Sequence, residues 1–165
     1  MRTGLLEPDL RGELDRAVAR IAADRHHLRR LGISLKAEYR AGFIGAELIQ
    51  PAGRLYLPHP AGFGALILGV WSGEPPSALA TCGDGVLLDL LACNTGEPGR
   101  WWRRMGIADA VLGAENYHVA LDTGRPIALH PHPLAWLQAE CRGACPVEWL
   151  ERCRSAPAAS WAEAA

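Results

Sequence analysis

The chain has 165 residues, of which 49% are hydrophobic and 21% charged, and its formal net charge at pH 7 is −1. This length fits one domain with its own core, and this composition is typical of a folded globular chain rather than a disordered one. A net charge this close to zero excludes a protein that is attracted to nucleic acid by its whole surface, although it is compatible with a local basic patch.

Localisation is inferred from features that the sequence lacks. The residues after Met1 contain no apolar stretch typical of a signal peptide. The longest apolar run, Ala65 to Trp71, is far shorter than the roughly 20 residues that span a bilayer. Five cysteines, an odd number, indicate free thiols in a reducing compartment rather than a disulfide framework. We therefore expect a cytoplasmic protein without a membrane partner.

The first predicted element is an amphipathic helix from Pro8 to Leu31. Its apolar residues recur at helical spacing, at Leu10, Leu14, Ala17, Ile21 and Leu28. Gly32 follows two arginines and is placed to end the helix in the left-handed conformation. Such a helix packs its apolar stripe against the rest of the protein.

Short β-forming runs separated by Gly and Pro follow, a pattern that predicts an antiparallel meander. The predicted strands are Leu35–Arg40, Ile44–Ile49, Arg54–Leu57, Ala65–Trp71 and Val86–Leu91. The last two are continuously apolar, as is typical of strands buried on both faces. Val86–Leu91 could equally form a short buried helix, because periodicity does not separate the two at this length.

Shorter elements are predicted for the C-terminal half. They are a helix from Pro98 to Gly113, strands at Tyr117–Leu121 and Pro126–Leu129, a helix from Pro133 to Gly143 and a last helix from Pro146 to Arg154. We therefore expect one α+β domain over residues 1–154, with an N-terminal amphipathic helix, a central, mostly antiparallel sheet and short C-terminal helices. Residues 155–165 are expected to form a flexible tail.

Four segments resemble uncharacterised, often prophage-linked proteobacterial proteins. They are Val86-Leu-Leu-Asp-Leu-Leu-Ala, Gly99-Arg-Trp-Trp-Arg-Arg-Met-Gly, Val111-Leu-Gly and Pro133-Leu-Ala-Trp-Leu-Gln-Ala. The resemblance covers the C-terminal half and implies a phage or mobile-element context. It implies no residue role, because the function of those proteins is itself unknown.

A Trp/Arg cluster is the first candidate binding site: Arg100, Trp102, Arg103 and Arg104. On the predicted helix Trp101 lies on the apolar stripe, whereas Trp102 is turned away from it by about 100°. An exposed Trp beside arginines is typical of a protein interface, and it also suits stacking on unpaired bases. The alternative is that both tryptophans belong to the core.

Two histidines and two cysteines are weak candidates for a zinc site: His130, His132, Cys141 and Cys145. Imidazole and thiolate are zinc ligands, but structural zinc sites more often use Cys-x₂-Cys, and core cysteines in a proline-rich region explain the same pattern. No metal or cofactor is therefore predicted.

A catalytic arrangement is the last alternative. Cys82 lies in a Gly-rich turn where a reactive thiol could sit, with His118, His130 or His132 as a base and Asp84 or Asp122 to orient it. A hairpin turn at Asp84-Gly85 explains the same residues. Asp89 interrupts an apolar run and must be paired, hydrogen-bonded or facing solvent.

The function that these observations favour is that of a non-catalytic binding or regulatory protein with another protein as partner. A small Cys/His-dependent enzyme and a nucleic-acid-associated protein are the alternatives. The sequence leaves a homo-oligomer open.

Overall fold

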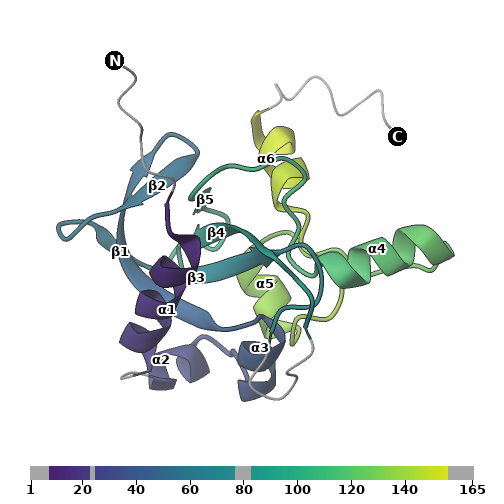
Figure 1. Ribbon diagram of the computed structural model, residues 1–165, viewed down its shortest axis with the longest axis horizontal. Helices are drawn as coiled ribbons and strands as arrows, with labels where there is room; N and C mark the ends of the chain where they lie inside the picture. Colours follow the sequence, from purple (N-terminus) through teal and green to yellow (C-terminus); the bar gives the residue numbers. More distant parts are fainter. Residues whose placement is uncertain (1–7, 23–24, 77–82, 156–165) are drawn as a thin grey trace.

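The computed structural model describes residues 8–22, 25–76 and 83–155, and it shows a small closed β-barrel surrounded by helices (Figure 1). The strands are β1 (Ile44–Ala52), β2 (Leu55–Pro58), β3 (Phe63–Trp71), β4 (Leu87–Cys93) and β5 (Trp101–Arg103). The helices are α1 (Leu10–Ile21), α2 (Arg25–Arg30), α3 (Leu35–Arg40), α4 (Ala114–Thr123), α5 (Pro133–Gln138) and α6 (Val147–Ser155). The α+β class predicted from the sequence is confirmed.

The barrel has the strand order β1-β2-β5-β4-β3, and β3 pairs back with β1. Four of its pairs are antiparallel, as expected, but β2 pairs with β5 in parallel through Leu55 and Arg103. The strand β1 is long enough to pair with β3 through its first half and with β2 through its second. The sheet closes into a barrel because β1 pairs with both β2 and β3 and because β2 pairs with β5. The sequence did not predict this closure.

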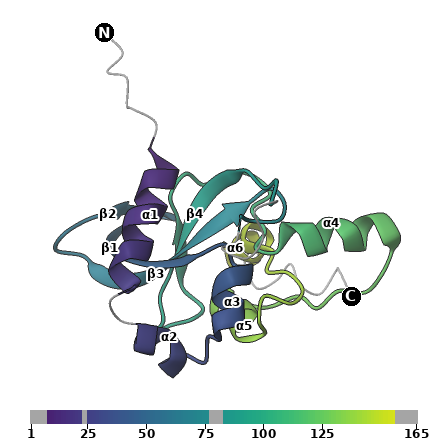
Figure 2. The ribbon, with the colours of Figure 1, turned by 60° about the horizontal axis from the view of Figure 1, so that its bottom comes forward.

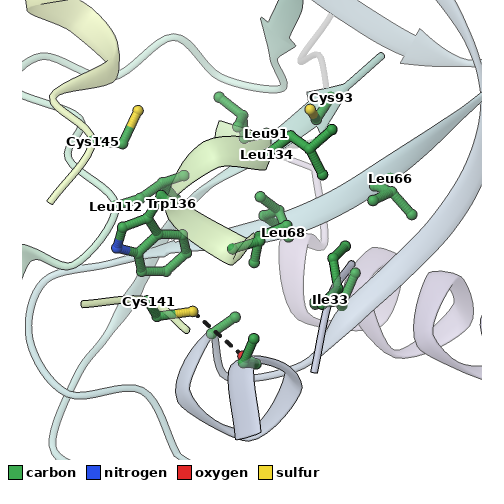
Figure 3. Close-up of a cluster of buried hydrophobic side chains, with 14 of the residues drawn as sticks. Ile33, Leu66, Leu68, Leu91, Cys93, Leu112, Leu134, Trp136, Cys141 and Cys145 are labelled. Carbon is green, nitrogen blue, oxygen red and sulfur yellow. Dashed lines mark hydrogen bonds between the residues drawn. The ribbon is translucent and has the colours of Figure 1, made fainter. Parts of the chain in front are cut away.

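Residues Ala65–Trp71 of β3 are buried on both faces, which confirms the interpretation of this apolar run. In β4 both faces are buried only from Asp89 onward, because Leu88, like Val86 just before the strand, is exposed. One set of side chains fills the barrel together with Leu14 and Ala17 of α1. The alternate set, with Leu66, Leu68 and Leu91 among it, packs outward against α2, α3 and α5 (Figure 3). The strands β3 and β4 therefore each contribute side chains to two separate cores.

The predicted N-terminal helix is two helices, α1 and α2, which lie on different parts of the barrel (Figure 2). The apolar stripe was correctly identified, since Leu14, Ala17, Ile21 and Leu28 are all buried. Gly32 has the expected left-handed conformation, with φ of 74°. The continuity of the helix was the error.

Four segments have a different secondary structure from the predicted one. Leu35–Arg40 is the helix α3 rather than a strand, because the Ser34 side chain caps it by accepting from the amide of Ala37. Tyr117–Leu121 belongs to the helix α4, and the predicted helix from Pro98 to Gly113 is mostly irregular and contains β5. Leu129 forms only an isolated bridge with Ala144.

The helices α5 and α6 confirm the two last predicted helices, and Pro133 is the first residue of α5, as proline favours. The predicted tail lies outside the described residues apart from Ser155, which ends α6. Within the described part of the chain, no helix has the length and apolarity needed to cross a membrane.

Candidate functional site

A cavity of about 600 Å³ opens between α3, the end of β3, the start of α4 and the loop after α5. Cavities of roughly 300–1,000 Å³ are typical of small-molecule sites. Aromatic side chains line it from α3, β3 and α5: Tyr39, Trp71 and Trp136. The site therefore joins elements that lie far apart in the sequence.

Three basic side chains, Lys36, Arg40 and Arg142, line the same cavity. All three contact Glu140: Lys36 Nζ lies 3.5 Å and Arg142 Nη2 3.2 Å from its carboxylate, and Arg40 donates to its carbonyl oxygen at 3.2 Å. The Glu140 carboxylate thus pairs with two of the three cations and its carbonyl oxygen with the third, so three positive charges stand against one negative charge on this wall. The exposed carboxylates of Glu74 and Glu115 also line the cavity.

The loop that carries Arg142 has an unusual backbone. Glu140 and Cys141 have φ of 56° and 58°, and Gly143 follows with φ of 78°. Left-handed conformations are unfavourable for two consecutive non-glycine residues and are concentrated at functional sites. The Gly143 carbonyl accepts hydrogen bonds from Trp136 Nε1 at 3.3 Å and from the Asn116 side chain at 3.2 Å, so this loop is fixed against α4.

Trp71 forms part of the floor of the cavity and is only 7% exposed. Its indole nitrogen is buried and has no hydrogen-bond partner among the described residues. A Cβ built on Gly69 would lie 2.5 Å from this nitrogen, so only glycine leaves room beside it there. An unsatisfied buried donor is rare in folded proteins, which makes this N–H a candidate contact for a ligand.

The Trp/Arg cluster expected on the surface is largely internal. Trp102 is 6% exposed and points into the barrel, where its ring meets Phe63 edge-on with centroids 5.4 Å apart. Arg103 is equally buried and pairs with Glu151 of α6 at 3.1 Å. The prediction of an exposed Trp102 on a helix was wrong, and the alternative that both tryptophans belong to the core is the one found. Successive residues of a strand alternate between its faces, and β5 is buried on both, so Trp101 packs in one core and Trp102 in the other.

The other two arginines of the cluster also make intramolecular contacts. Arg104 forms two hydrogen bonds to Glu13 of α1, at 2.9 and 3.0 Å, and so ties the helix to the residues after β5. Arg100 is exposed; it pairs with Glu97 at 3.3 Å and its guanidinium carbon lies 5.6 Å from the Trp102 ring centroid. A binding role for these residues stays a prediction.

Asp89 is fully buried on β4 and accepts hydrogen bonds from four backbone amides. Those of Leu90, Met105, Gly106 and Ile107 lie 2.7–3.3 Å from its carboxylate oxygens. The sequence left three environments open for Asp89: paired with a cation, hydrogen-bonded or facing solvent. The structure shows the hydrogen-bonded one. Asp89 holds the turn after β5, where Gly106 has φ of 70°.

The four zinc candidates do not lie around one point; three of them make hydrogen bonds within the fold, and the fourth lies apart. His132 caps α5 by accepting from the amide of Ala135, and His130 Nε2 lies 2.7 Å from the Arg142 carbonyl oxygen. Cys141 donates to the Ala37 carbonyl oxygen at 3.4 Å, whereas Cys145 lies on the other side of Leu112 and Trp136 (Figure 3). No three potential ligand side chains converge among the residues that the structure describes.

Burial raises the pKa of the Cys141 thiol and of the Cys93 thiol to about 12, so both are protonated at neutral pH. A protonated thiol is a poor nucleophile. Cys82 lies outside the described residues. Of its suggested partners, His118, Asp84 and Asp122 are exposed, and His130 and His132 are half-buried. The catalytic arrangement around Cys82 stays untested.

The fold and the cavity define an α+β domain built on a five-stranded closed barrel, with a polar and aromatic cavity beside it. Comparisons with protein-family models, with curated proteins and with solved structures found no match. The site therefore has to be interpreted from its own chemistry. Sequence reasoning missed it because Lys36 and Arg40 fell in a segment predicted as a strand; Ser34 ahead of a run of helix-forming residues was the signal that could have placed them on a helix.

Proposed function

We propose that this protein is a non-catalytic binding domain that holds a small polar molecule in the cavity between α3, α4 and the loop after α5. One observation carries the proposal: basic and aromatic side chains from separate segments converge on a cavity of ligand size, about 600 Å³. The buried indole N–H of Trp71, which has no partner among the residues that the structure describes, and the strained loop at Glu140 support it.

The binding function is the one predicted from the sequence, but its proposed location is different. The expected interface depended on an exposed Trp102, and this ring lies inside the barrel. Stacking on unpaired bases, the basis of the nucleic-acid alternative, loses its aromatic platform for the same reason. A regulatory role, a protein partner, a cytoplasmic location and a phage or mobile-element origin remain proposals without support from the cavity.

The test is a screen of a small-molecule fragment library against the ¹⁵N-labelled full-length chain, followed by amide chemical shifts. Glycines line the cavity on three sides, and the amides of Gly69, Gly73, Gly113 and Gly143 are its reporters. We expect fragments that carry a polar group on a ring to shift these four signals together.

Two results would overturn the proposal. The first is a library in which no fragment shifts the four glycine signals at millimolar concentration. The second is a set of shifts collected at the second cavity, of about 560 Å³, which is lined by Arg16, Arg20 and His59. Chemical-shift changes confined to the residues around Arg100 would also contradict the proposal, because they would place the binding site at the Trp/Arg cluster.

A further inference from the structure

We infer that the ligand of this cavity carries an oxyanion, a carboxylate or a phosphate, which sits against the first turn of α4 and accepts a hydrogen bond from Trp71. This inference rests on the proposed function and names the chemical class of the ligand. It depends on three groups of donors that line one cavity: the start of α4, the Trp71 indole and the basic wall.

The first donor group is the N-terminus of α4, which spans ten residues from Ala114 to Thr123. Its N-cap is Gly113, with φ of 74°, and no side chain caps it among the described residues. Gly113, Ala114 and Asn116 all line the cavity. The first amides of a helix have no acceptor within it and carry the positive end of its dipole, so an anion is stabilised there.

The second donor is the indole N–H of Trp71, which is more than nine-tenths buried and unpartnered among the described residues. It lies beside Gly69, which lines the cavity as well. An N–H group can only donate, so its missing partner is an acceptor. A carboxylate or phosphate oxygen is such an acceptor, whereas an ammonium group is not.

The third group is the basic wall of Lys36, Arg40 and Arg142, of which Glu140 neutralises one charge. Arginine presents its N–H groups in a planar fork that fits carboxylate and phosphate oxygens. Glu115 and Glu74 line the cavity too and are exposed. Because Glu115 is in the first turn of α4, its backbone amide remains a donor whatever its side chain binds.

The test compares four probes on the full-length protein by isothermal titration calorimetry: benzoate, inorganic phosphate, benzyl alcohol and benzylamine. We expect benzoate or phosphate to bind at least about tenfold more tightly than benzyl alcohol, since charge-assisted hydrogen bonds differ from neutral ones by this order. Binding of phosphate without benzoate points to a phosphorylated ligand, and the reverse to a carboxylate.

Two variants and a control locate the anion. Trp71→Phe keeps a ring but removes the N–H, and we expect roughly a threefold to tenfold loss of affinity for the better anion. Arg142→Gln is expected to weaken it by a similar factor, whereas Arg152→Gln, which replaces an equally exposed arginine on α6, is expected to have no effect. In the wild-type protein the ¹H signal of the Trp71 indole N–H is expected to move downfield when the anion is added, and this readout does not depend on any variant.

The inference is contradicted if benzyl alcohol or benzylamine binds as tightly as the anions at the same glycine reporters; the proposed function would then survive with another ligand class. It is equally contradicted if an anion binds but the Trp71 indole signal stays in place. If none of the four probes binds while other fragments still shift the glycine reporters, only the oxyanion is wrong. If nothing shifts them, both proposals fall.

Discussion

Asp89 accepts four backbone hydrogen bonds without exposing any of its surface. Its removal would leave the buried amide of Leu90 and the partly buried amides of Met105 and Gly106 without this acceptor. We expect Asp89→Ala to lower the free energy of unfolding by about 3 kcal/mol or more. Urea denaturation followed by tryptophan fluorescence would measure this change.

The matched control for this variant is Asp84→Ala, which removes an exposed carboxylate shortly before the same strand. It is expected to change the free energy of unfolding by no more than about 0.5 kcal/mol. Equal stabilities of Asp89→Ala and the wild type would show that the turn after β5 does not depend on this carboxylate.

Glu151 is a second buried carboxyl group, and its pKa is raised above the ordinary value of 4.5 mainly because of burial. Arg103 and the Trp101 indole N–H oppose this rise only in part. The folded state therefore binds the proton of Glu151 more tightly than the unfolded state does. The stabilisation from this difference is fully present below the unfolded pKa and is lost as the pH rises through the folded pKa.

This pH dependence can be tested with Glu151→Gln, because the glutamine side chain does not titrate. The free energy of unfolding of the wild type minus that of Glu151→Gln is expected to fall as the pH rises from about 4 to neutrality. Chemical denaturation of both proteins at several pH values gives this difference and cancels the titration of all other groups. A difference that increases with pH would mean that the ion pair with Arg103 outweighs burial.

At the scale of the elements, the contact between α1 and β1 depends on a glycine. A Cβ built on Gly45 would lie 2.5 Å from the Ala17 Cβ and 2.7 Å from the Ala17 carbonyl carbon. Such contacts require the helix to move away from the barrel. We expect Gly45→Ala to destabilise the protein by roughly 1–3 kcal/mol, measured as the free energy of unfolding.

Gly64 gives a control in the neighbouring strand, since a Cβ built on it meets nothing within 4 Å. Alanine has a smaller entropy loss on folding than glycine, so Gly64→Ala is expected to be neutral or slightly stabilising. If the two variants had the same stability, close packing of α1 on β1 would not be a determinant of this fold.

Elements with an unambiguous pattern could be predicted from the sequence. The apolar run of β3 and the proline-initiated α5 are such cases, whereas the run of β4 left a strand and a short helix equally open. The segment around Trp101 could not be placed, because its apolar residues match helical spacing by coincidence while tertiary packing makes it a strand. The candidate site was missed for a related reason: the cavity depends on segments that only the closed barrel brings together.

At the scale of the whole molecule, two cores share the same strands, and the cavity lies where their helical cover meets the end of β3. Trp71 belongs to the barrel core yet lines the cavity, so the two are contiguous. The helix α4 extends away from the remainder of the structure, and only its first residue is buried (Figures 1 and 2). Its start at the cavity is therefore the part of α4 that we connect with function.

The most direct test of the account fills the cavity without touching its charged groups. Gly73 lines the cavity, and a Cβ built on it has no neighbour closer than 3.4 Å. We expect Gly73→Phe to fold and to weaken the fragment that binds the wild type best by about tenfold or more, measured as Kd by calorimetry. Gly64→Phe adds the same ring at an exposed position that lines the second cavity instead of this one, and it is expected to leave this Kd unchanged. An undiminished affinity of Gly73→Phe would contradict the claim that this cavity is the binding site.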